Sequence, residues 1–186
     1  MRLFLSLAML AMSILGSGSA AAETKGNPKV RIETSKGAFV VELYPDKAPI
    51  SVKNFLQYVD EKFYDGTVFH RVIKGFMIQG GGFSPDLVQK KTRDPIKLEV
   101  GKGLSNQKGM LAMARTMVQD SATAQFFVNH VDNANLDTYG GGYAVFGKVV
   151  DGMDTVEAIA NVRTAVQNGM RDVPAEVVTI KSVRRL

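Results

Sequence analysis

The chain has 186 residues and carries 23 Lys and Arg against 18 Asp and Glu, a formal net charge of +5. It contains no Cys, which excludes structural disulfides, Cys-ligated zinc and a thiol nucleophile. The basic residues are spread along the chain without a concentrated patch, so we expect no nucleic-acid partner.

Residues 1–22 have the pattern of a secretory signal peptide. Arg2 is followed by an uncharged apolar run over residues 3–15 and by small residues that end in Ala20-Ala21-Ala22, an A-x-A cleavage site. The apolar run is shorter than the roughly 20 residues that span a bilayer, which favours cleavage over retention as an anchor. We therefore predict an exported protein that is free of the membrane after cleavage.

The mature chain opens with a polar segment and a hairpin. Residues 23–29 are predicted to form a flexible leader, and residues 30–186 a single domain. Residues 30–33 alternate apolar and charged side chains, the period of a half-buried strand. A turn at residues 35–37 leads into a returning strand over residues 38–43.

The middle of the chain combines a helix, a hairpin and a long loop. Apolar residues between 50 and 63 follow helical spacing, and Asp65-Gly66 ends the helix. Residues 67–80 are predicted to form two strands joined near Gly75. Residues 81–97 are polar and contain Gly and Pro, as in a functional or surface-wrapping loop.

Short strands continue to the end of the chain. They are predicted at residues 110–114, 125–128, 143–150 and 176–183, with a second helix over residues 154–162. No internal repeat or linker interrupts them. Many short strands with two helices predict an antiparallel barrel or sandwich that is capped by helices.

The sequence offers few groups for covalent or metal chemistry. No Ser stands in a G-x-S-x-G elbow. His70 and His130 are the two histidines, and neither has metal-ligand spacing. We interpret both as ordinary histidines, and we expect no metal and no cofactor.

One stretch, residues 69–81, places polar side chains within an apolar hairpin. If its strands pair about Gly75, Arg71 and Gln79 lie nearly opposite and share a face, with Phe76 and Met77 close by. Periodicity alone favours a core hairpin whose polar groups merely face water. A ligand-binding face is the alternative.

Several motifs in register resemble the cyclophilin family. Beside residues 69–81, the family's order and spacing are matched at residues 109–115 (GMLAMAR), 125–127 (QFF) and 145–149 (VFGKV). The resemblance extends over about residues 28–186. Ala114-Arg115-Thr116 and Tyr143 resemble the bacterial periplasmic branch of that family.

The resemblance implies a mainly β protein: a closed eight-stranded antiparallel β-barrel with an α-helix over each open end and a groove on its outer face. It implies a peptidyl-prolyl cis-trans isomerase that acts on proline-containing unfolded or exported polypeptides in the periplasm. The catalytic residues carried over are Arg71, Phe76, Gln79 and Phe127. The substrate-binding residues carried over are Met77, Ala114, Arg115, Gln125, Leu136 and Tyr143.

Two positions depart from the better-known eukaryotic pattern. Tyr143 stands where those members have His, and Asn135 falls where many carry Trp. Since that Trp helps to bind cyclosporin in the family, we expect weak binding of the drug here. No extended apolar stripe argues against a monomer.

A non-catalytic chaperone module that captures proline-containing segments is the main alternative function. Intact Arg71, Phe76, Gln79 and Phe127 argue against it, because degenerate members are expected to lose some of these residues. A protein that binds polyanionic surfaces is the third reading, and it predicts strongly salt-dependent association.

Overall fold

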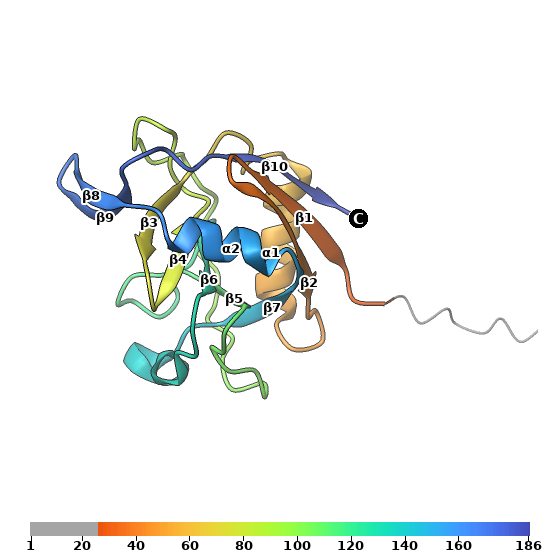
Figure 1. Ribbon diagram of the computed structural model, residues 1–186. Helices are drawn as coiled ribbons and strands as arrows, with labels where there is room; N and C mark the ends of the chain where they lie inside the picture. Colours follow the sequence, from red (N-terminus) through yellow and green to blue (C-terminus); the bar gives the residue numbers. More distant parts are fainter. Residues whose placement is uncertain (1–25) are drawn as a thin grey trace, which may run out of the picture.

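The computed structural model describes residues 26–186 (Figure 1). The predicted signal peptide and the first residues of the predicted leader lie outside this range and stay predictions. Strand β1 begins at Lys29, one residue inside the predicted leader. The strands are β1 (Lys29–Thr34), β2 (Gly37–Leu43), β3 (Phe69–Ile73), β4 (Met77–Gly80), β5 (Met110–Met113), β6 (Phe126–Asn129), β7 (Val145–Asp151), β8 (Thr164–Gln167), β9 (Met170–Pro174) and β10 (Ile180–Arg185). The helices are α1 (Pro49–Asp60) and α2 (Met153–Ala160), with two 3-10 turns, η1 (Ala134–Asp137) and η2 (Tyr139–Gly141).

Eight of the strands form one curled antiparallel sheet in the order β10-β1-β2-β7-β5-β6-β4-β3. Successive side chains of each strand point to opposite faces. The strands β5 and β6 are buried on both faces, because the interior packs on one side and a second apolar cluster packs on the other. The sheet therefore presents two apolar surfaces.

The resemblance implied a closed barrel, whereas the ladder is open between β3 and β10. Within residues 26–186 these edge strands are linked just before each begins, by an isolated bridge between Val68 and Thr179. Backbone hydrogen bonds from Phe69 to Val178 (2.9 Å) and from Ile180 to Thr67 (2.7 Å) flank that bridge. The structure thus shows a mainly β half-barrel whose edges touch, not a continuous eight-stranded ring of paired strands.

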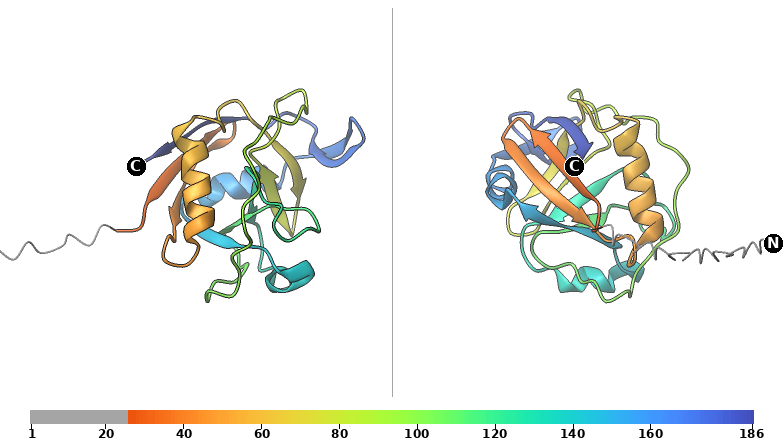
Figure 2. Two further views of the ribbon diagram at one scale, coloured as in Figure 1. Left: turned by 180° about the vertical axis from the view of Figure 1, so that it is seen from behind. Right: turned by 90° about the vertical axis from the view of Figure 1, so that its right-hand side faces the viewer.

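The two helices lie on opposite sides of the curled sheet (Figures 1 and 2). Phe55 and Val59 of α1, with Val156 and Ile159 of α2, enter the same interior cluster. This arrangement confirms the predicted helical caps, and it closes the interior with side chains. Within residues 26–186, no helix has both the length and the apolar character needed to cross a membrane.

The element boundaries agree with the sequence prediction within a few residues, with two exceptions. The final strand begins at Ile180, four residues later than predicted. Strands β8 and β9, which were not predicted, form a separate hairpin. Its two turn residues, Asn168 and Gly169, both have positive φ (48° and 78°), as a type I′ turn requires. The Asn-Gly pair was the sequence signal for this hairpin.

Candidate active site

A β-bulge in β3 sets the direction of Arg71. Phe69 pairs with Gly80 and Arg71 pairs with Gln79, so β3 holds His70 as one extra residue. Without a bulge, Phe69 and Arg71 would share a face. The bulge lets Phe69 enter the interior cluster while Arg71 reaches the outer face. Re-aiming a side chain in this way is a common use of bulges beside functional sites.

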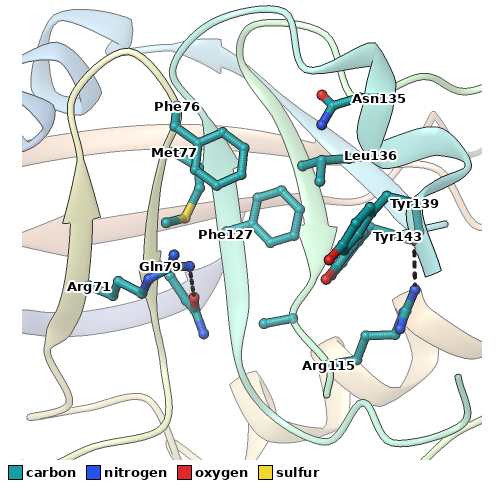
Figure 3. A pocket seen from close by; sticks show the side chains of 11 residues that line it. Arg71, Phe76, Met77, Gln79, Arg115, Phe127, Asn135, Leu136, Tyr139 and Tyr143 are labelled. Carbon is teal, nitrogen blue, oxygen red and sulfur yellow. Dashed lines mark hydrogen bonds between the residues drawn. The ribbon is translucent and has the colours of Figure 1, made fainter. Parts of the chain in front are cut away.

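Cross-strand register brings the candidate residues into one row. Arg71 of β3 lies opposite Gln79 of β4, and Gln79 lies opposite Phe127 of β6. The predicted pairing of Arg71 and Gln79 is confirmed. This row borders an outer pocket of about 340 Å³, in which Arg71 and Gln79 lie on one side and aromatic rings on the other (Figure 3).

A chain of side-chain hydrogen bonds runs along the polar side of the pocket. Nη1 of Arg71 donates to Oε1 of Gln79 at 3.4 Å, and Nε2 of Gln79 donates to Oε1 of Gln125 at 3.0 Å. Because a guanidinium has no acceptor, Gln79 must turn its oxygen toward Arg71 and its amide nitrogen toward Gln125. The orientation of Gln79 is therefore fixed from both ends.

Apolar side chains line the centre of the pocket. Met77, Phe127 and Leu136 are buried and belong to the second apolar cluster, with Phe76 packed against them. Phe76 stands at the end of the β3–β4 turn, and its carbonyl accepts hydrogen bonds from the backbone of His130 (2.9 Å) and the side chain of Asn133 (2.8 Å). The turn that presents Phe76 is thus tied to the chain beyond β6.

Arg115 shapes the opposite wall. Its guanidinium lies over the Tyr143 ring, 4.4 Å from the ring centre, a favourable cation–π geometry. Its Nε donates to the carbonyl of Gly142 (2.9 Å), and Nη2 donates to that of Gly140 (2.9 Å). Tyr143 in turn meets Phe127 edge to face at 5.8 Å. Arg115 therefore holds the loop that carries Tyr139 and Tyr143, and most of its hydrogen-bond donors are used there.

His70, the bulge residue, is buried beside this row. Only 6% of its surface is exposed, and its ring lies 4.4 Å from that of Phe83. Burial lowers the pKa of His70 to about 4, so the ring is neutral at pH 7. Within residues 26–186 its Nδ1 is buried without a hydrogen-bond partner. By contrast, both ring nitrogens of His130 have partners. Its Nδ1 accepts a hydrogen bond from the backbone amide of Gly75 (3.0 Å), and its Nε2 lies 2.6 Å from Oε2 of Glu157.

The structure brings nearly all the predicted site residues to this pocket. Gln125 is the exception, because it lies behind Gln79 and lines a neighbouring cavity that also reaches Arg71. Asn135, noted as a departure, is part of the rim. Tyr139 also lines the pocket and was missed. Its signal was an aromatic residue beside three glycines, four positions before Tyr143.

Comparison with known proteins assigns the family. The family model described as cyclophilin type peptidyl-prolyl cis-trans isomerase/CLD matches residues 29–185. The chain belongs to the cyclophilin family. A peptidyl-prolyl cis-trans isomerase of Acinetobacter baylyi is 50% identical over 173 residues, which cover 92% of each chain. Peptidyl-prolyl cis-trans isomerase B of Escherichia coli is 54% identical over 159 residues, which cover 83% of this cyclophilin and 97% of the Escherichia coli protein.

Solved structures agree with this assignment. A cyclophilin type peptidyl-prolyl cis-trans isomerase of Cryptosporidium parvum has a TM-score of 0.76 and 28% identity, covering 86% of this chain and 98% of its own. A crystal structure of that protein in the presence of the dipeptide Ala-Pro gives a TM-score of 0.74 and 30% identity, covering 84% and 97%. This cyclophilin is therefore a peptidyl-prolyl cis-trans isomerase, an enzyme that catalyses proline isomerisation.

Proposed function

We propose that this cyclophilin accelerates rotation about X-Pro bonds in the outer pocket, with Arg71 as the group that stabilises the twisted amide. The observation that carries the proposal is the row Arg71-Gln79-Phe127 across three strands, which places a guanidinium and an apolar ring in the lining of one pocket. The Ala-Pro dipeptide named with the Cryptosporidium structure supports proline-containing peptides as substrates.

The reaction breaks no covalent bond. Amide resonance sets a barrier of about 20 kcal/mol to rotation, and the uncatalysed exchange takes tens to hundreds of seconds. When the amide twists, the proline nitrogen becomes pyramidal and gains a lone pair that can accept a hydrogen bond. An enzyme accelerates the rotation by binding this twisted form more tightly than either planar isomer.

Arg71 suits this task because its guanidinium stays charged and offers several donors in a rigid plane. We assign it hydrogen bonds to the substrate carbonyl and, in the twisted state, to the proline nitrogen. Phe76, Met77, Phe127 and Leu136 hold the proline ring, while Gln79 and Gln125 orient Arg71. No step needs a change of protonation state.

The test is a protease-coupled assay of an X-Pro peptide. Arg71→Ala is expected to lower kcat/KM about a hundredfold or more, equivalent to about 3 kcal/mol. Arg71→Lys should fall between, since it keeps the charge and loses the planar fork. Arg31→Ala, at an exposed position of β1, is the control. Equal rates for Arg71→Ala and the wild type would refute the assignment.

We also propose that the clients are exported proteins and that the enzyme works in the periplasm. The support is the signal-peptide pattern of residues 1–22. Expression of the full chain in a Gram-negative host, followed by fractionation and mass measurement, tests this proposal. A periplasmic product that begins near Glu23 supports it, and an uncleaved cytoplasmic product contradicts it.

A monomer with weak cyclosporin affinity is proposed as well. Asn135 stands on the pocket rim where the family resemblance places Trp in many members. Asn135→Trp should raise the affinity for the drug about tenfold or more, because a Trp offers a large apolar contact and an N–H donor. Calorimetric titration measures the affinity, and light scattering on the same samples measures the mass.

Finally, we propose that the Val68–Thr179 bridge closes the barrel in solution. The hydrogen bonds of the Phe69 and Ile180 amides support this. Hydrogen exchange should then be as slow at these two amides as at Val128 in the sheet centre. Exchange as fast as in exposed loops would indicate an open sheet.

A further inference from the structure

The hairpin of β8 and β9 stands beside β3, the edge strand that carries Arg71 (Figure 1). Its residues Met170, Arg171 and Asp172 line the cavity that adjoins the active pocket across Arg71. Almost all of β8 is exposed, and β9 buries only Val173 and Pro174, neither of which belongs to the interior cluster. The position of the hairpin suggests a contribution to the site itself.

Asp172 adopts an uncommon backbone conformation in this hairpin. Its φ is +62°, a region that most residues other than Gly avoid, although Asp tolerates it better than most. Ala165 pairs with Val173 and Gln167 with Met170, so β9 sets Arg171 and Asp172 opposite the single residue Val166. This is a β-bulge, and like the one at His70 it redirects a side chain.

The redirected carboxylate meets the catalytic guanidinium. Oδ2 of Asp172 lies 3.9 Å from Nε of Arg71. Arg71 also donates from Nη1 to Gln79, so two different nitrogens of its fork face two different oxygen groups. Both charged side chains are about two-fifths exposed (42% and 40%), and exposed pairs of this kind add little to folding stability. The geometry therefore matters for orientation more than for stability.

We infer that Asp172 is a positioning residue for Arg71, and that the bulge in β9 serves to place its carboxylate. The inference rests on the proposed role of Arg71. With Gln79 on one side and Asp172 on the other, the guanidinium plane has a preferred orientation before substrate binds. Losing one neighbour lets the long Arg side chain sample orientations that do not face the twisted amide, so the rate of rotation on the enzyme falls.

The test uses a variant that removes the carboxylate without straining the backbone, so that an effect on the orientation of Arg71 can be told from an effect on folding stability. Asp172→Gly removes the carboxylate while Gly accepts positive φ freely, so the melting temperature should stay level or rise. The expected loss is about fivefold to tenfold in kcat/KM, mostly in kcat. Asp172→Asn keeps an oxygen acceptor and tolerance of positive φ without the charge, and should lie between. Asn168→Gly makes the same kind of change at the φ 48° position of the same hairpin, and should leave kcat unchanged.

Each outcome of the experiment decides one point. Full kcat in a folded Asp172→Gly variant would overturn the inference, and so would an equal loss in Asn168→Gly. In an Arg71→Ala background, adding Asp172→Gly should change nothing further, and a further loss would show that Asp172 acts without Arg71. Wild-type activity in Arg71→Ala alone would instead refute the role proposed for Arg71, and the two failures are thus distinguishable.

Discussion

Two apolar clusters share the same strands and have different tasks. The interior cluster contains Phe126 on β6 and is closed by both helices. The outer cluster contains the next residue, Phe127, and borders the pocket of about 340 Å³. Both residues are buried, at 0% and 4% exposure. Burial alone therefore does not tell a core residue from a site residue in this molecule.

Strand alternation makes the difference. Residues of one parity fill the interior, and residues of the other parity face the pocket. Two bulges break that rule, at His70 in β3 and at Arg171 and Asp172 in β9. A substitution should therefore affect mainly stability or mainly activity according to the face on which its side chain lies.

The largest effect is expected for Phe126→Ala, in the interior. The Phe126 ring packs against those of Phe55, Tyr64 and Phe69, with ring centres 5.6, 5.5 and 6.2 Å away. Its loss leaves a cavity that rigid neighbours cannot fill, which should lower the free energy of unfolding by about 3–5 kcal/mol. Urea denaturation followed by circular dichroism measures it. A loss below about 1 kcal/mol would show that the interior is not the main source of stability.

The second largest effect is the pH dependence of stability that arises from His70, the bulge residue of β3. Its pKa is lowered by burial from 6.5 to about 4. Between these values the unfolded chain binds the proton and the folded chain does not, so stability falls as pH decreases from about 6.5 to 4. The full difference is about 3 kcal/mol, at 1.36 kcal/mol for each pKa unit.

His70→Gln removes this titration and is the variant to compare. Unfolding free energies are measured in urea at several pH values from 7 to 4 for both proteins. The wild-type curve should drop more steeply than that of the variant, while His130 is present in both. Parallel curves would show that His70 is protonated in the folded protein as easily as in the unfolded chain.

Substitutions in the outer cluster should lower activity more than stability. Phe127→Leu keeps an apolar side chain but loses the edge-to-face contact with Tyr143 and the flat surface for the proline ring. We expect kcat/KM to fall about tenfold, or about 1.4 kcal/mol, with a smaller loss of stability than in the matched Phe126→Leu. Comparing both variants in both assays tests the division by face. A reversed pattern, with activity lost only in Phe126→Leu, would break it.

Much of this arrangement could be read from the sequence. Apolar periodicity located both helices and most strands, and the turn at Gly75 predicted the pairing of Arg71 with Gln79, which the register confirms. The family resemblance supplied the other pocket residues except Tyr139. It also implied a closed ring of strands, and here the ladder stops between β3 and β10.

What the sequence did not reveal are features with no apolar pattern. Strand β8 is almost entirely exposed and β9 buries only Val173 and Pro174, so hydrophobic periodicity is weak there, and the Asn-Gly turn was the remaining signal. The bulge at Asp172 follows from the register of two strands and has no local signature. Tyr139 reaches the pocket through the fold of a glycine-rich loop, which spacing alone does not define.

The smallest effect is expected at the surface, where Arg185 of β10 meets Asp60 of α1. The contacts are bidentate, at 2.7 and 2.6 Å, yet both side chains are about half exposed (47% and 53%). Solvent and salt screen such a pair, so Arg185→Ala should cost less than about 1 kcal/mol. The difference should shrink further in 1 M salt. Lys181→Ala, at an exposed position of the same strand, is the control, and urea denaturation at low and high salt is the measurement. A loss comparable with that of Phe126→Ala would mean that α1 is held over the sheet by charge, and that the apolar interior is not what fixes the helix in place.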